Sequence, residues 1–315
     1  MKSHQLVSVV IPTYNRDYVV CRAIDSVLQQ SYKHVEVIVV DDGSTDQTYS
    51  LLRAYGNQIR VITQTNSGPS VARNRGIANA NGDIVAFLDS DDYWLPTKLA
   101  RQVEVLEQVG DHVPCCICNC TILYKDGSRS STFTIADTVP NCPTGVWFNP
   151  AEVLTTRFVI FSQAVAIRRE FLDRVGAFDE NLPFFCEDHE LALRLALAGP
   201  WAVIRDELVV CQDGGPGSLG QRALREEVRL RSDLVYMRSR ILNIVESGPT
   251  GRRLKNLARR ELGAAKRTLI AARLANRKFR GAATLSKAIR VLERFRRALF
   301  RRSPSYPRVV VRQLS

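Results

Sequence analysis

The sequence predicts an α/β fold, in which helices cover both faces of a mostly parallel sheet, followed by a basic helical C-terminal region. Three observations lead to this prediction. Short apolar runs alternate with segments of helical spacing in the first half of the chain. Turn-forming and acidic residues close several of these runs, as expected at strand ends. The charge is also uneven: residues 1–215 hold 18 Lys and Arg against 26 Asp and Glu, whereas residues 216–315 hold 26 against 6.

The predicted strands are apolar runs of the kind that a parallel strand buried on both faces requires. They occupy residues 6–11, 35–40, 60–63 and 83–88. Between them lie segments in which apolar residues recur at helical spacing. The clearest apolar stripes comprise Val20, Ile24, Val27 and Leu28, and then Leu95, Leu99, Val103 and Leu106. Pro69 and Pro96 are expected to open helices, because a first helical position needs no N–H donor.

A run of cysteines, CCICNC, suggests either a zinc site or a further strand. Its members are Cys115, Cys116, Cys118 and Cys120. Their spacing differs from the paired C-x₂₋₄-C pattern of zinc sites, and no histidine follows closely. Free cysteine packs as a small hydrophobe, so a buried strand is the favoured interpretation.

Compartment signals are few. The N-terminus lacks the layout of a signal peptide, and the longest uncharged apolar stretch, 158–167, is shorter than the ~20 residues of a membrane span. A cytoplasmic protein is therefore expected, with peripheral association at the inner face of the cell membrane as an extension of this hypothesis. The division of charge also predicts two units, 1–215 and 216–315.

Two acidic loops, DDGSTD (41–46) and DSDD (89–92), follow predicted strands. In an open α/β sheet the ligand binds outside the carboxyl ends of the strands, so these loops are expected to meet at one edge. The sequence contains neither of the usual glycine-rich phosphate loops. A divalent cation, Mg²⁺ or Mn²⁺, can hold phosphates instead, using one or two carboxylates. Such a cation would also relieve the repulsion among the aspartates.

Five segments together resemble the family 2 glycosyltransferases, which have the GT-A nucleotide-sugar fold. They are VSVVIPTYNR (7–16), VIVVDDGSTD (37–46), NSGPSVARNRG (66–76), FLDSDD (87–92) and GAFDENLPFFCEDHELALRLALAG (176–199). The resemblance covers roughly two-thirds of the chain. It implies a GT-A catalytic domain over residues 1–215.

On the nucleotide side, the resemblance implies that Pro12, Thr13 and Tyr14 line the uracil and ribose. It implies that Asp42 accepts a hydrogen bond from the base and that Arg73 lies beside the nucleotide. Turn formation is the alternative for Asp42, because Asp and Ser often form Asx-type turns.

On the reacting side, the resemblance implies that Asp91, with Asp92 close behind, holds the metal, while Asp89 approaches the ribose. Asp188 resembles the catalytic base of inverting members, and Glu187 beside it is assigned to substrate binding. Helix capping is the alternative for Asp188, since carboxylates favour the first turn of a helix.

Two departures concern histidine. Many relatives carry a histidine after the helix that bears the base, whereas this chain has CQDGGPGSLG (211–220) there. Gln212 or Asp213 is a candidate replacement. His189 directly follows the proposed base and is expected to lie on the helix surface, without an assigned role.

The basic region is predicted to be helical between residues 221 and 302. One apolar stripe comprises Leu254, Leu257, Leu262, Ala265 and Leu269, and a second comprises Leu285, Ile289, Leu292 and Leu299. Two alternatives remain: a packed helical subdomain with a solvated basic exterior, or an amphipathic surface that docks on anionic lipid. Nucleic acid is not an expected partner, because no nucleic-acid-binding module is apparent.

These observations predict an inverting, metal-dependent glycosyltransferase. Its donor would be a nucleotide sugar, with UDP favoured, and its acceptor a hydroxyl of a saccharide or lipid-linked molecule. The product would serve surface polysaccharide or glycan synthesis. The alternative is a non-catalytic protein that keeps the fold and binds a nucleotide sugar or nucleic acid. The presence of both Asp91 and Asp188 favours the enzyme, because binding alone needs no base.

Overall fold

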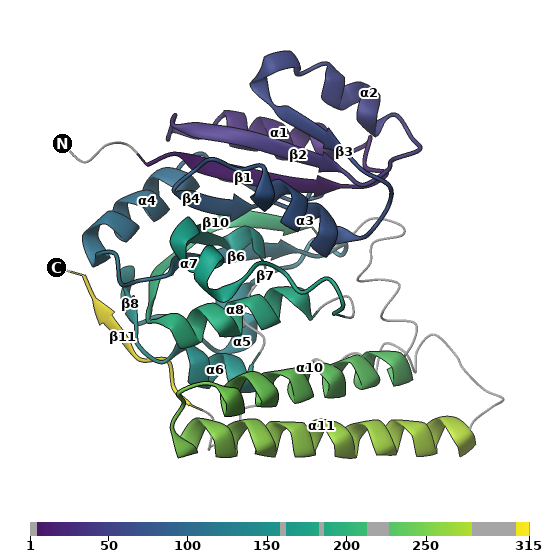
Figure 1. Cartoon of the computed structure of the whole chain (residues 1–315), viewed down its shortest axis with the longest axis vertical. Coiled ribbons are helices and arrows are strands. Elements are labelled where there is room, and N and C mark those ends of the chain that lie inside the picture. The colour runs from purple at the N-terminus through teal and green to yellow at the C-terminus, as the bar shows by residue number, and fades with distance from the viewer. Residues whose placement is uncertain (1–4, 158–161, 183–185, 213–226, 279–306, 315) are drawn as a thin grey trace.

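The computed structural model describes residues 5–157, 162–182, 186–212, 227–278 and 307–314 (Figure 1). One sheet runs through the centre, with strand order β11-β8-β10-β6-β9-β4-β1-β2-β3, while β5 pairs with β10 and β7 with β6. The strands are β1 (Val7–Thr13), β2 (Val35–Asp41), β3 (Arg60–Thr63), β4 (Ile84–Phe87), β5 (Tyr93–Trp94), β6 (Cys115–Leu123), β7 (Arg129–Ser131), β8 (Thr144–Trp147), β9 (Val165–Arg168), β10 (Trp201–Gln212) and β11 (Val311–Gln313).

The sheet is mostly parallel, as predicted. β1 pairs in parallel with β2 and β4, β2 with β3, and β6 with β10. β9 is the internal exception, because it lies antiparallel between β4 and β6. β8 is antiparallel to both of its neighbours, β10 and β11. The antiparallel β9 was not predicted, and it carries chain directly to the carboxyl edge of β4.

The strands are buried as their composition requires. Every residue of β1 is buried, and so are the last five of β2. The cysteine run forms β6, where Cys115, Cys116, Cys118 and Cys120 are buried free thiols. The prediction of a buried strand is therefore confirmed for this run.

Helices flank the sheet (Figure 1). They are α1 (Val20–Leu28), α2 (Thr48–Arg53), α3 (Pro69–Ala78), α4 (Lys98–Val109), α5 (Thr132–Ala136), α6 (Pro150–Thr156), α7 (Arg169–Val175), α8 (Glu187–Ala198), α10 (Glu227–Ser247) and α11 (Arg252–Lys278), with single 3₁₀ turns η1 (Gly56–Gln58) and η2 (Ser162–Ala164). Pro69 opens α3 as expected. Helix α4 begins at Lys98, two residues later than predicted, and leaves Leu95 exposed.

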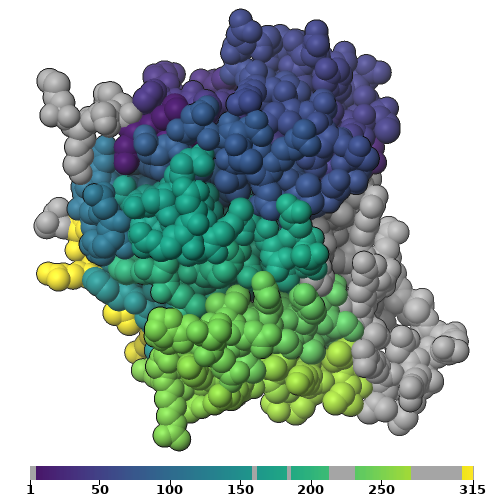
Figure 2. All heavy atoms as spheres, in the orientation of Figure 1, coloured from purple at the N-terminus to yellow at the C-terminus, as the bar shows by residue number. Residues whose placement is uncertain are grey.

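The C-terminal region packs against the rest of the molecule. Helices α10 and α11 lie side by side and contact α8 and α6, respectively (Figures 1 and 2). Met237, Ile241 and Val245 of α10 join the same apolar core as the central strands. The boundary between 215 and 216 remains a prediction, but the two predicted units share a core.

The first predicted apolar stripe of this region faces inward. Leu254, Leu262, Ala265 and Leu269 are buried along α11. The second stripe, residues 285–299, falls outside the described residues. Within the described part of the chain, no helix combines the length and apolar character needed to span a membrane.

Candidate active site

The acidic loops lie on either side of β1 at the carboxyl edge of the sheet. Parallel pairing places Thr13 opposite Asp41, where β1 and β2 end together, and Val10 opposite Phe87 at the end of β4. The loops that follow β2 and β4 therefore emerge at the same edge. The prediction that the two loops meet there is confirmed.

Asp42 organises the side of this edge that was predicted to bind the nucleotide. Its carboxylate accepts hydrogen bonds from the backbone N–H groups of Ser67 and Gly68 and from the Gln64 amide, each at 2.8 Å. Asp42 thereby holds the loop that enters α3. The neighbouring Asp41 accepts from Ser44 in a local turn. The turn interpretation therefore fits Asp41, whereas Asp42 makes longer-range bonds.

The loop after β1 offers both a buried and an exposed surface. Pro12 and Thr13 are buried, whereas the Tyr14 side chain is 42% exposed at the rim. The Asp42 N–H donates to the Thr13 carbonyl at 2.8 Å, which ties the two loops together. An exposed aromatic ring beside two joined loops can stack on a flat base. The assignment of these residues to uracil and ribose remains a prediction.

Asp89 and Asp91 occupy different surroundings in the second loop. Asp89 accepts from the Arg73 guanidinium at 2.7 Å. The Asp91 side chain is 29% exposed, and an Arg16 nitrogen lies 3.7 Å from its oxygen. Arg22 donates to the Asp91 carbonyl at 2.7 Å and so fixes the backbone rather than the carboxylate. Burial, followed by the charge of Asp89, raises the pKa of Asp91 against the effect of Arg16.

Asp92 is buried, and the protein uses both of its oxygens. Oδ1 accepts from the Gln212 N–H at 3.0 Å, and Oδ2 accepts from the Gln163 amide at 2.7 Å. Burial, with further contributions from Cys211 and Asp91, raises the pKa of Asp92 well above its ordinary value. Asp91 is therefore the more open of the two predicted metal ligands.

Asp188 lies in the first turn of α8. Its Oδ2 accepts from the Ser162 N–H at 2.9 Å, and its side chain is 13% exposed. The N-cap residue of α8 is Cys186, and no side-chain cap hydrogen bond is present there. The capping alternative thus has no hydrogen bond to support it. Burial raises the pKa of Asp188 to about 7, with Glu187 and Asp89 adding to the rise and Arg73 opposing it.

Arg73 of α3 lies between Asp89, which follows β4, and the carboxylates at the start of α8. Its guanidinium lies 2.7 Å from Asp89, 3.3 Å from Glu187 and 3.9 Å from Asp188. It also lies over the Phe178 ring at 5.3 Å. Burial opposes its charge, yet the three carboxylates outweigh burial and raise the pKa of Arg73. One cation facing three carboxylates leaves an excess of negative charge that favours a further cation.

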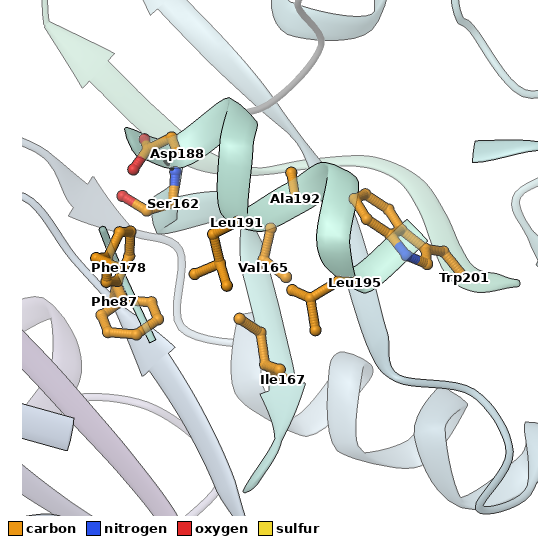
Figure 3. Close-up of a pocket in the computed structure, with 10 residues that line it drawn as sticks. All are labelled: Phe87, Ser162, Val165, Ile167, Phe178, Asp188, Leu191, Ala192, Leu195 and Trp201. Atoms are coloured by element: carbon orange, nitrogen blue, oxygen red, sulfur yellow. Dashed lines mark hydrogen bonds between the residues drawn. The ribbon is translucent and has the colours of Figure 1, made fainter. Parts of the chain in front are cut away.

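The inner side of Asp188 is apolar (Figure 3). A cavity of about 20 Å³ lies beneath α8, with Asp188 and Ser162 at one end. Apolar side chains supply most of its wall: Phe87, Val165, Ile167, Phe178, Leu191, Ala192, Leu195 and Trp201. Apolar surroundings disfavour a charged carboxylate, which explains the direction of the pKa shift of Asp188.

The two histidine expectations have different outcomes. His189 is fully buried, with Nε2 at 2.7 Å from the Leu154 carbonyl, so the expected place on the helix surface is wrong. It is buried because α8 packs against α6 on that side. Burial lowers the pKa of His189 to about 3. Gln212 reaches the site through its N–H, whereas Asp213 falls outside the described residues.

The donor set suits a metal that the substrate helps to bind. In the described segments, no group of three or more His, Cys, Asp and Glu side chains could hold a metal by itself. Mg²⁺ usually takes one or two carboxylates and completes its shell with phosphates and water. Asp91 has the open oxygens for this role, and the excess negative charge around Arg73 adds to the attraction. The residues present therefore fit such a cation.

Sequence reasoning missed Ser162 and Gln163. Both are polar, yet both are buried at the start of the apolar run that becomes β9. The available signal was the polar pair that opens SQAVAIR (162–168), because two polar residues have no obvious role next to a buried strand. Recognising it also required knowing that β9 runs antiparallel to β4.

Comparison with known sequences is consistent with this geometry. Residues 8–146 match the family model described as glycosyl transferase family 2. An uncharacterized glycosyltransferase of Rickettsia conorii is 32% identical over 199 residues, which is 62% of this chain and 32% of that protein. WfaP of Escherichia coli is 29% identical over 197 residues, covering 62% of this chain and 72% of WfaP. The chain thus spans only 32% of the length of the Rickettsia relative.

Solved structures share the fold. S. aureus TarS 1–349 in complex with UDP-GlcNAc superposes with a TM-score of 0.64 at 21% identity, covering 93% of this chain and 81% of that one. The mannosyltransferase PcManGT of Pyrobaculum calidifontis, in complex with GDP-Man and Mn²⁺, gives 0.59 at 22% identity, covering 95% and 82%. The GT-A fold is therefore confirmed, and within this fold residues 8–146 match glycosyl transferase family 2.

Proposed function

We propose that this protein transfers a sugar from a nucleotide-sugar donor, with UDP favoured, to a hydroxyl of a saccharide or lipid-linked acceptor, with inversion at the anomeric carbon. One observation carries the proposal. Arg73 pairs both with Asp89, in the loop that also carries Asp91 and Asp92, and with Asp188 at the start of α8, all at the carboxyl edge. A leaving-group site and a base are thereby brought to one place.

Asp188 has the properties of a general base. A base works best when its pKa lies near the working pH, and the pKa of Asp188 is raised to about 7. The Ser162 N–H holds Oδ2, which fixes the direction of the carboxylate. Asp188 would accept the proton of the acceptor hydroxyl as that oxygen attacks the anomeric carbon. A single displacement inverts the centre and needs no carboxylate nucleophile.

The leaving group requires its own stabilisation. Mg²⁺ or Mn²⁺, held by Asp91 with Asp92 behind it, would supply Lewis-acid stabilisation of the departing diphosphate. Asp92 is kept rigid by its two hydrogen bonds, and Arg16 lies near Asp91 on the outer side. Asp42, Thr13 and the exposed Tyr14 would receive the nucleoside. The complex of PcManGT with Mn²⁺ and the TarS complex with UDP-GlcNAc are consistent with this chemistry.

The acceptor is proposed from relatives and from the surface of α11. WfaP is named as acting on a diphosphoundecaprenol-linked acceptor. A lipid-linked acceptor would be used at a membrane, and α11 presents a basic face on which anionic lipid could bind. We define this basic face by the exposed cationic residues Arg252, Arg253, Arg259, Arg260, Lys266 and Arg267. Since the apolar stripe packs inward, the attraction to lipid would be electrostatic, at the inner face of the cell membrane.

A donor screen tests the proposal. Release of the nucleoside diphosphate would be measured across a panel of nucleotide sugars, with Mn²⁺, with Mg²⁺ and with EDTA. Turnover of a UDP-sugar that depends on the metal supports the proposal, and Asp188→Asn serves as the catalytic control. The non-catalytic alternative would be favoured if a donor binds but is not turned over, even when an extract that contains lipid-linked acceptors is added.

A further inference from the structure

The short turn η2 contacts both the proposed base, Asp188, and a proposed metal ligand, Asp92. The Ser162 N–H donates to Asp188 Oδ2 at 2.9 Å. The next residue, Gln163, donates from Nε2 to Asp92 Oδ2 at 2.7 Å. Two consecutive residues therefore contact the proposed base and a proposed metal ligand. Arg73 differs, because within the described part of the chain it links Asp188 to Asp89 and makes no such contact with Asp92.

The antiparallel direction of β9 places the turn there. β9 pairs with β4 so that Ala166 lies opposite Ala86 and Ile167 opposite Val85. The residues before β9 consequently lie beyond the end of β4, where the aspartate loop begins. A parallel strand would have delivered its first residues to the opposite edge of the sheet.

The surrounding structure holds the turn in place. The Trp94 indole N–H donates to the Gln163 carbonyl at 3.2 Å. The Gln102 amide and the Cys118 thiol donate to the Ala164 carbonyl at 2.9 and 3.4 Å. Ser162, Gln163 and Ala164 are all buried. The turn is thus anchored by α4, β5 and β6 and is suited to orienting the groups that it contacts.

The orientation of the Gln163 amide follows from its neighbours. Its Nε2 faces the Asp92 carboxylate and also lies 3.3 Å from the Cys211 sulfur. A flipped amide would place its oxygen against a carboxylate oxygen. Gln163 is therefore a donor to Asp92, and its Oε1 has no hydrogen-bond partner among the described residues.

We propose that Gln163 is a positioning residue, which fixes the orientation of the Asp92 carboxylate that would help to hold the metal and, through the shared turn with Ser162, keeps Asp92 and Asp188 in fixed relative positions. This inference rests on the proposed function. Gln163 acts through Asp92 and the backbone of the turn. Partners that orient metal-binding residues typically affect metal affinity or activity ~10–100-fold when they are removed.

The test compares Gln163→Met with Gln30→Met. Methionine keeps the length of glutamine and removes its donor. Gln30 is a matched control, because it is equally buried and its amide donates to the Ser26 and Leu95 carbonyls, not to a carboxylate. Mn²⁺ affinity would be measured from the electron paramagnetic resonance signal of free Mn²⁺ in the presence of UDP. UDP affinity in EDTA and the melting temperature would be measured alongside.

We expect Gln163→Met to weaken Mn²⁺ binding ~10-fold or more while UDP affinity in EDTA is unchanged. Gln30→Met should lose thermal stability and retain the Mn²⁺ affinity of the wild type. If Gln163→Met does not fold, Gln163→Leu decides, because it also removes the donor and adds no charge. Either folded Gln163 variant binding Mn²⁺ as tightly as the wild type would overturn the inference. A wild type without Mn²⁺-dependent UDP binding or sugar transfer would instead remove the proposed function, and this inference with it.

Discussion

The carboxyl edge of the sheet and the α10–α11 hairpin both carry unbalanced charge, but in opposite surroundings. At the edge, Arg73 is buried among three carboxylates, and burial raises the pKa of Asp188 to about 7. On the hairpin, Arg253 pairs with Glu152 of α6 and Arg259 pairs with Glu246, and the two arginine side chains are 79% and 56% exposed. A buried charge interacts strongly with its few neighbours and can shift their pKa values. Exposed charges interact weakly one by one, act through their sum, and are screened by salt.

The largest expected effect concerns Asp91. Asp91→Asn removes one negative charge from the open position beside the proposed metal while keeping the size of the side chain. Because stabilisation of the leaving group is lost, transfer should fall at least ~10³-fold, and donor affinity should fall with it. The measurement is nucleotide release and donor binding by calorimetry. Full activity of the wild type in excess EDTA would contradict the metal requirement.

Asp188→Asn should lower turnover ~10²-fold or more, because an amide cannot accept the acceptor proton. Donor affinity should be retained. In the wild type, turnover should decrease as the pH falls through about 7, where the carboxylate becomes protonated. Turnover within a few-fold of the wild type would leave Asp188 without a catalytic role.

The raised carboxyl pKa of Asp188 also means that the folded state loses stability as the pH rises through about 7. The Asp188→Asn variant should therefore have a higher melting temperature than the wild type under mildly alkaline conditions.

Next in size is the effect on membrane binding. Replacing Arg252, Lys266 and Arg267 of the basic face by Gln should reduce cosedimentation with anionic liposomes by ~10²-fold at low salt, at about 1 kcal/mol for each charge. Binding of the wild type should fade with salt, since exposed charges are screened within about 8 Å at physiological ionic strength. Truncation is a poorer test, because α10 contributes Met237 and Ile241 to the core.

A control for this experiment is available on the other side of the molecule. Arg53, Arg60 and Arg75 are exposed on the elements around β3 and α3, away from the hairpin. Replacing these three by Gln removes the same charge and should leave liposome binding close to that of the wild type. Equal loss in both triple variants would show a dependence on net charge and none on the basic face.

The smallest expected effect concerns a buried charge other than Arg73. Lys98 is fully buried, its Nζ lies 3.7 Å from the centre of the Trp94 ring, and it has no hydrogen-bond acceptor among the described residues. Burial lowers the pKa of Lys98 to about 8. Because the folded state disfavours the charged amine, Lys98→Met should raise the free energy of unfolding by about 2 kcal/mol near neutral pH.

The pH dependence of this gain has a definite sign. The gain should be full below about pH 8 and shrink as the pH rises toward the value for an unfolded lysine. Chemical denaturation at a series of pH values measures it. Lys266→Met on the basic face is the matched control and should leave stability unchanged at each pH, since its side chain is exposed. A destabilised Lys98→Met variant would show that the contact with Trp94 outweighs burial.

The sequence predicted the position of a residue correctly where that position depends only on the end of a parallel strand. The loops containing Asp42 and Asp91 follow apolar runs, and parallel strands bring their ends to one edge, so their meeting could be predicted. Gln163 could not be placed in this way, because its role depends on the antiparallel direction of β9. The burial of His189 likewise depends on α6 packing against α8. The spacing of apolar residues along the chain predicts neither the direction of β9 nor the packing of α6 against α8.

The Asp92 carboxylate accepts hydrogen bonds from residues that lie far along the chain. Gln163 is 71 residues away and Gln212 is 120 residues away, and both must dock before the carboxylate has its two donors. Contacts of such long sequence separation form late in folding, and the N-terminal part of a chain generally folds first during synthesis. The parallel strands β1 to β4 can therefore pair with one another while the chain is still being made, before Asp92 has either donor. The proposed base and metal ligands would reach their final arrangement only after β9 and β10 have joined the sheet, so the proposed transfer would require the folded chain.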